Sequence, residues 1–115
     1  LRTAIPTLIM GDFNSRLRTQ LRPHSPTYLH EAVDVFEDFL LATNARRHHS
    51  TAPTHRFGTL DHICITERFI SALTNMRELP TKLWSDHALI LGLLKIKYKV
   101  PTPSQHATRP DYRAL

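Results

Sequence analysis

Apolar residues concentrate in three short runs, separated by stretches rich in polar, charged and turn-forming residues. The runs at residues 5–10, 59–66 and 88–96 have the length and composition typical of strands. The third run is almost continuously apolar, which predicts a strand with both faces covered, as in the interior of a layered fold. Together with the helical pattern between the first two runs, they predict an α/β fold.

Residues 25–44 follow helical spacing. Ser25 is a candidate N-cap, Pro26 suits the first helical position, and Asn44 suits a left-handed helix end. The apolar stripe of this helix is expected to face the core, while its acidic residues form a solvated face. The stripe comprises Leu29, Ala32, Val33, Phe36, Phe39, Leu40 and Thr43, and the acids are Glu31, Asp34, Glu37 and Asp38.

Shorter segments complete the predicted order of elements. Residues 15–26 and 45–59 are expected to be exposed loops, the second with an edge strand as an alternative. Residues 67–73 predict a short helix, and residues 74–84 a weak strand and a turn that ends in a core Trp84. Residues 100–115 contain several prolines and no periodic apolar pattern, which predicts a linker or tail after a domain at residues 1–99.

Composition narrows the class of protein. The chain has 115 residues, 41% hydrophobic and 22% charged, which indicates one modest globular domain. Its net charge of +5 favours polyanionic partners without identifying any chemistry. Cys64 is the only cysteine, so it predicts a buried core position and a reducing, intracellular compartment. A run of about 18 apolar residues, as a membrane span needs, is absent, and so is a leader pattern.

Polar side chains stand at an end of each apolar run. Asp12 and Asn14 follow the first run, Asp61 opens the second, and Asp86 and His87 precede the third. Hard oxygen ligands of this kind favour Mg²⁺ or Mn²⁺, and such a set suits phosphodiester hydrolysis. Taken one at a time, the same aspartates are equally typical of turns and caps.

Three motifs in this order resemble a known family. The segments GDFN at 11–14, LDHI at 60–63 and SDHALI at 85–90 are similar to the last three motifs of the endonuclease/exonuclease/phosphatase superfamily. The nearest resemblance is to the apurinic-type endonuclease domains of non-LTR retrotransposons. It implies the C-terminal half of a layered α/β sandwich of the deoxyribonuclease I type, truncated at its N-terminus. It also implies a longer polyprotein in which residues 100–115 lead toward a reverse transcriptase.

The resemblance implies a role for each motif residue. Asp12 would orient or deprotonate the attacking water and touch the metal. Asn14 would donate its amide to a phosphate oxygen and belong to the metal set, in which Asp86 is a further ligand. His87 would lie against the scissile phosphate, and Asp61 would pair with its imidazole, fixing the tautomer and raising the pKa. The implied cofactor is Mg²⁺ or Mn²⁺.

The implied partner is DNA, with a nuclear location if genomic DNA is cleaved. Arg16, Arg18 and Arg56 are candidate phosphate contacts, and solvated connections are the alternative. His48, His49 and His55 match no structural zinc spacing, so a surface loop is favoured for them. His62 is expected to pack or hydrogen-bond beside the site without a catalytic role.

The family's first strands and its metal-binding glutamate have no counterpart in this sequence. The piece alone is therefore expected to be a weak or inactive enzyme, marginally folded, with apolar faces and edges exposed. Two alternatives stay open. One is an inactive retroelement remnant that at most binds nucleic acid, and the other is a family member acting on a phospholipid or inositol phosphate.

Overall fold

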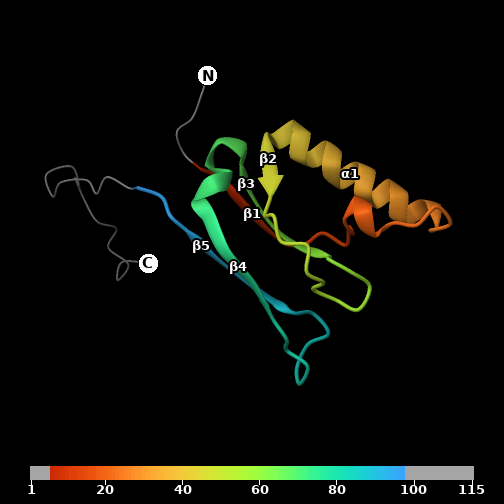
Figure 1. The fold of residues 1–115 in the computed structure, drawn as a ribbon. Coiled ribbons are helices and arrows are strands. Elements are labelled where there is room, and N and C mark those ends of the chain that lie inside the picture. The colour runs from red at the N-terminus through yellow and green to blue at the C-terminus, as the bar shows by residue number, and fades with distance from the viewer. Residues whose placement is uncertain (1–5, 98–115) are drawn as a thin grey trace, which may run out of the picture.

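The computed structural model describes residues 6–97, and the predicted tail at 100–115 lies outside them. Two antiparallel sheets and one long helix make up this α/β domain (Figure 1). No helix within residues 6–97 is long and apolar enough to cross a membrane. The elements are β1 (Leu8–Asp12), η1 (Arg18–Gln20), α1 (Thr27–Thr43), β2 (Ala45–Arg47), β3 (Asp61–Thr66), η2 (Glu67–Ala72), β4 (Leu73–Leu79) and β5 (Leu89–Leu94).

The three-stranded sheet has β3 at its centre, with β1 and β2 antiparallel on either side. The predicted first strand was expected to end before the glycine, but β1 continues through Gly11 and Asp12. Its register sets Asp12 directly opposite Asp61. Directly opposed positions of antiparallel strands have close Cβ atoms. The pairing of β1 with β3 therefore brings two predicted site carboxylates together.

Side chains of β3 alternate between two apolar layers. Cys64 packs with Phe36 of α1 and Ala45 on one face of the sheet. Ile63 and Ile65 pack on the other face, against the layer formed by η2, β4 and β5. Figure 1 shows α1 on one side of this sheet and the β4–β5 hairpin on the other. The observed order is thus helix, sheet, sheet, with β3 buried between them.

Helix α1 confirms the predicted stripe at its centre, since Val33 and Phe36 are its buried residues. Its start differs from the prediction by one position. Pro26 is the N-cap, with φ −56° and ψ 147°, while the Ser25 hydroxyl accepts a hydrogen bond from the Arg22 N–H at 2.9 Å. Ser25 therefore closes the preceding turn instead of capping the helix. Asn44 adopts the predicted left-handed conformation, with φ 53°.

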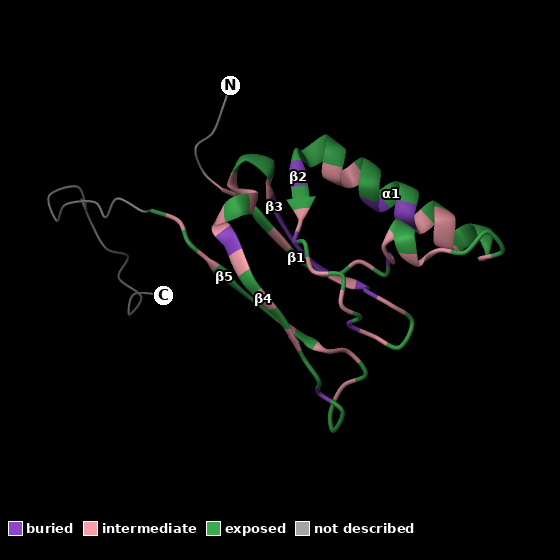
Figure 2. Cartoon of the chain, viewed as in Figure 1, coloured by how far each residue is buried: buried purple, intermediate pink, exposed green. Residues whose placement is uncertain are grey.

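Strand β5 contradicts the prediction that both of its faces are covered. Ile90 packs inward, whereas Leu89, Leu91 and Leu93 are 45%, 38% and 45% exposed. Figure 2 shows most of β5 in the colour of exposed residues. The reason is that the β4–β5 sheet has two strands and is covered on one face by the other sheet. A continuous run of apolar residues shows that both faces of a strand can be buried, but it does not show whether another element packs against each face.

Trp84 contradicts its predicted core position, since it is 76% exposed. The tight turn before β5 is responsible, because the N–H groups of Trp84 and Ser85 both donate to the carbonyl oxygen of Thr81 at 3.0 Å. This turn leaves the indole in solvent. Cys64, in contrast, is fully buried as predicted, and burial raises the pKa of its thiol to about 11.

Two buried histidines predict acid sensitivity. Burial lowers the pKa of His62, and burial with the neighbouring Arg47 lowers the pKa of His48 to about 4. Since the unfolded chain takes up these protons near pH 6.5 and the folded chain resists them, stability falls as pH drops from about 6.5 toward 4. Urea unfolding at a series of pH values measures this. Replacing His48 by Gln is expected to flatten the profile, and an unchanged acid slope would contradict the assignment.

Candidate functional site

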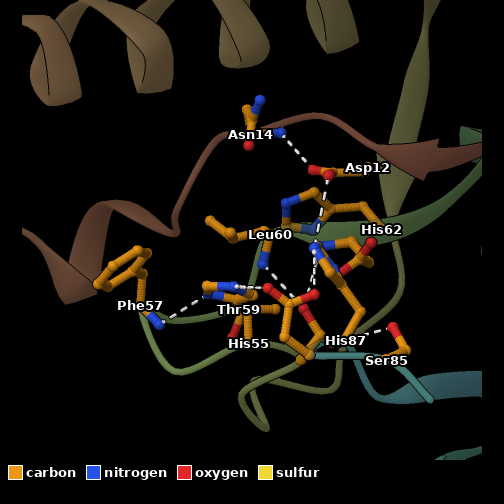
Figure 3. A network of polar contacts seen from close by, with 12 residues as sticks. Asp12, Asn14, His55, Phe57, Thr59, Leu60, His62, Ser85 and His87 are labelled. Carbon is orange, nitrogen blue, oxygen red and sulfur yellow. Dashed lines mark hydrogen bonds and ion pairs between the residues drawn. The ribbon is translucent and has the colours of Figure 1, made fainter. Parts of the chain in front are cut away.

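The candidate site forms where β1 and β3 meet the segment before β5 (Figure 3). Residues 85–88 are held in place by backbone contacts. The Ala88 N–H donates to the Thr54 carbonyl at 2.7 Å, the Thr81 hydroxyl donates to the His87 carbonyl, and the His87 N–H donates to the Ser85 hydroxyl at 3.0 Å. These contacts position the His87 imidazole against the β1–β3 pair.

His87 contacts the aspartates of all three motifs. Its Nδ1 lies 2.8 Å from Asp61 Oδ2, so the expected Asp61–His87 contact is present. A carboxylate only accepts, so Nδ1 carries the proton and Nε2 faces the other two acids. Nε2 lies 3.8 Å from Asp12 Oδ2 and 3.9 Å from Asp86 Oδ1. The hydrogen bond that His87 donates to Asp61 raises the pKa of His87, with the charges of Asp61, Asp12 and Asp86 adding to the effect.

Asn14 contributes to the site through its backbone. It has φ 52°, and its N–H donates to Asp12 Oδ1 at 2.8 Å. Asparagine is among the residues that tolerate this left-handed conformation. The bond fixes one oxygen of Asp12, and the other oxygen, Oδ2, is the one near His87. Figure 3 shows the Asn14 side chain beyond Asp12, apart from the imidazole.

A second Asp–His contact lies beside the first, and the sequence analysis did not predict it. His55 Nε2 is 3.0 Å from Asp86 Oδ2, and the rings of His55 and His87 are 4.8 Å apart. The sequence placed His55 in a surface loop, but its side chain is only 8% exposed. The available signal was its position before Gly58, in a tight turn leading to the strand of Asp61.

His62 packs beside the site, as predicted. Its ring stacks on Phe36 with centroids 4.6 Å apart, and Nε2 donates to the Ser15 carbonyl at 2.8 Å. Its Nδ1 accepts from Arg47 Nε at 3.1 Å. Both ring nitrogens are therefore engaged, which leaves His62 no free group for chemistry.

Among residues 6–97, two overlapping groups of side chains could hold a cation. Asp12, Asp61 and His87 form one, and His55, Asp86 and His87 form the other, with ligand atoms within 4.8 Å in each. The predicted metal residues Asp12 and Asp86 thus fall in different groups, although both carboxylates lie near Nε2 of His87. The first group offers two carboxylates beside solvent, which suits Mg²⁺ or Mn²⁺, ions that retain several waters.

The three candidate arginines have different surroundings. Arg18 binds Asp34 at 2.6 Å and Glu37 at 2.7 Å, so its charge is compensated by the helix acids that were expected to be only solvated. Arg16 and Arg56 instead lie over the ring of Phe57, at 5.8 and 4.8 Å from its centroid. Arg16 and Arg56 thus remain candidate contacts, whereas Arg18 is satisfied within the domain.

The Asp61–His87 pair predicts a pH signature. Because folding raises the pKa of His87, the pair's contribution to stability is complete below pH about 6.5 and is lost as pH rises through the raised pKa. Asp61→Asn is expected to lower the pKa of His87, as measured by NMR titration of the imidazole. Asp38→Asn, on the exposed face of α1, serves as the control. An identical His87 titration in wild type and Asp61→Asn would contradict the pairing.

Comparison of the chain with protein-family models, with curated proteins and with solved structures gave no match. The interpretation of the site accordingly depends on its own geometry. That geometry is a histidine held by one aspartate, with two further carboxylates within 4 Å of its free nitrogen.

Proposed function

We propose that this chain carries the C-terminal part of a metal-dependent phosphodiesterase site that cleaves DNA, as in the superfamily that its motifs resemble. The observation that carries the proposal is the meeting of Asp12, Asp61 and His87 from three separate segments. The helix–sheet–sheet layering supports the same assignment. In the resembling proteins such a domain precedes a reverse transcriptase, and we propose the same context here.

His87 is the group that would bind the scissile phosphate. Asp61 holds Nδ1 and raises the pKa, so the imidazolium form is favoured and Nε2 can donate to a phosphate oxygen. A donor preorganised in this way stabilises charge that develops on the phosphate in the transition state. The second role of Asp61 is to fix the ring orientation.

Asp12 is the candidate base for the attacking water. The Asn14 N–H holds Oδ1, while Oδ2 lies on the side of His87 and the Asp12 side chain is 41% exposed. Asn14 would in addition direct its amide to a non-bridging phosphate oxygen. Mg²⁺ or Mn²⁺ would neutralise phosphate charge when bound, with Asp12 and Asp86 as the carboxylates that hold it.

An exposed aromatic–arginine surface favours DNA over a phospholipid or inositol phosphate. Phe57 is 54% exposed beside His55, and the guanidinium groups of Arg16 and Arg56 both lie over its ring. Aromatic rings stack on bases, and arginines contact phosphates. The second candidate function is binding of nucleic acid without cleavage. It would use the same surface and would differ only in not needing Asp12, Asp61 and Asp86.

A plasmid-nicking assay separates the two candidates. The full chain is expected to nick supercoiled DNA weakly in Mg²⁺, because part of the family's site has no counterpart in it, and to lose this activity in EDTA, because the carboxylates need a cation to approach the phosphate. Asp86→Ala is expected to reduce nicking while DNA binding, measured by fluorescence anisotropy, is retained. Asp38→Ala is the matched control on α1. Equal nicking by wild type and Asp86→Ala would contradict the proposal that this site cleaves DNA. Release of phosphate from inositol phosphates without any nicking of DNA would contradict the proposal that DNA is the substrate.

A further inference from the structure

His55 donates a hydrogen bond to a site carboxylate and belongs to none of the three motifs. We propose that His55 is a positioning residue that fixes the Asp86 carboxylate toward His87. Its importance for catalysis rests on the proposed function, whereas its effect on the conformation of Asp86 does not.

The His55 ring is itself rigidly held. The Phe57 N–H donates to His55 Nδ1 at 3.1 Å, inside a turn closed by reciprocal backbone bonds of 3.0 Å between His55 and Gly58. The ring packs between Phe57 and His87, at centroid distances of 5.0 and 4.8 Å. Thr54 anchors the turn, because its hydroxyl accepts from the N–H groups of Leu60 and Asp61.

Asp86 has no comparable support from packing. Its side chain is 77% exposed, against 8% for that of His55. An exposed aspartate is free to change rotamer unless a hydrogen bond restrains it. The bond from His55 Nε2 holds Oδ2 at 3.0 Å, and the remaining oxygen, Oδ1, then lies 3.9 Å from His87 Nε2. The same bond lowers the pKa of Asp86, which keeps the carboxylate ionised.

The tautomer of His55 decides whether its Nε2 acts as a hydrogen-bond donor or as a metal ligand. Because Nδ1 accepts from the Phe57 N–H, the neutral ring carries its proton on Nε2. A metal ion needs a lone pair on that nitrogen. His55 therefore acts on Asp86 as a hydrogen-bond donor, even though His55, Asp86 and His87 together have the spacing of a metal site. Hydrogen bonds to ligating carboxylates are a common means of orienting them.

The test begins with the metal-free full chain. Long-range ¹H–¹⁵N NMR is expected to show His55 protonated on Nε2, and coupling constants are expected to show a single χ1 rotamer for Asp86. His55→Phe, which keeps a ring but removes the donor, is expected to make the Asp86 rotamer average. His55→Gln, which keeps a donor near the position of Nε2, is expected to preserve it. Protonation on Nδ1, or an equally ordered Asp86 in His55→Phe, would overturn the proposal.

Mn²⁺ binding then shows whether this positioning matters for the site. His55→Phe is expected to weaken Mn²⁺ affinity by about ten- to a hundredfold, measured by EPR of the free ion, with His55→Gln close to wild type. Unchanged affinity in His55→Phe would overturn the role toward the metal. A wild-type chain that binds no Mn²⁺ would count against the proposed function instead, and the rotamer measurement would still decide the role of His55.

Discussion

Replacing His87 by alanine is expected to lower Mg²⁺-dependent DNA nicking by about 10²- to 10⁴-fold, the range for loss of a catalytic proton-transfer or donor group. His87 contacts all three aspartates of the motifs, and Nε2 is its only free ring nitrogen. The measurement is the single-turnover nicking rate of a supercoiled plasmid. Asp61→Asn is expected to show a smaller loss, because it removes the group that orients the ring and leaves the imidazole in place.

The matched control for this experiment is His49→Ala, since His49 is an exposed histidine outside the site. It is expected to nick at the wild-type rate. If His87→Ala and His49→Ala nicked equally well, the imidazole would have no part in cleavage. Coupling between positions 61 and 87 is also expected, so the double variant should lose less than the product of the two single losses.

Phe36→Ala is expected to cost about 3–5 kcal/mol of unfolding free energy, as large-to-small changes at buried aromatic residues do. Phe36 is 6% exposed, and its ring lies 5.0 Å from that of Phe13 and 4.6 Å from that of His62. A loss of this size is a large part of the stability of a small domain. Urea denaturation followed by circular dichroism measures it.

The neighbouring Val35 provides the control on the same helix. It is 68% exposed, so Val35→Ala is expected to change the unfolding free energy by less than about 0.5 kcal/mol. Equal destabilisation by the two substitutions would contradict the packing of α1 on the β1–β3–β2 sheet. Because Phe36 also packs on His62 beside the site, Phe36→Ala is expected to reduce nicking as well.

Local patterns predicted the helix well. The stripe that places Val33 and Phe36 inside and the left-handed end at Asn44 both follow from residue spacing and backbone preference. The strand predicted at residues 88–96 is present as β5. The prediction that both of its faces are covered was wrong, because coverage depends on which elements pack against the strand. Trp84 was misplaced for a similar reason, since a turn of the backbone decides the direction of its side chain.

The site shows the same division between local and tertiary information. The sequence motifs identified Asp12, Asp61 and His87 as site residues. Tertiary structure brings the three together, through the β1–β3 register and the position of the segment before β5. His55 was missed because its role arises from the conformation of the His55–Gly58 turn, which spacing alone does not reveal. Arg18 was chosen for its charge, and only the packing of η1 near α1 shows that Asp34 and Glu37 already bind it.

Paramagnetic broadening by Mn²⁺ tests the shared cation pocket most directly. In ¹H–¹⁵N spectra of the full chain, substoichiometric Mn²⁺ bound by Asp12 and Asp86 is expected to broaden the amides of Asp12, Asp61 and His87 together, because His87 lies against all three aspartates. Those of the α1 acids Glu31 and Asp38 are expected to remain sharp. Broadening confined to the helix acids, or its absence at residues 12, 61 and 87, would contradict a metal site shared by the three segments.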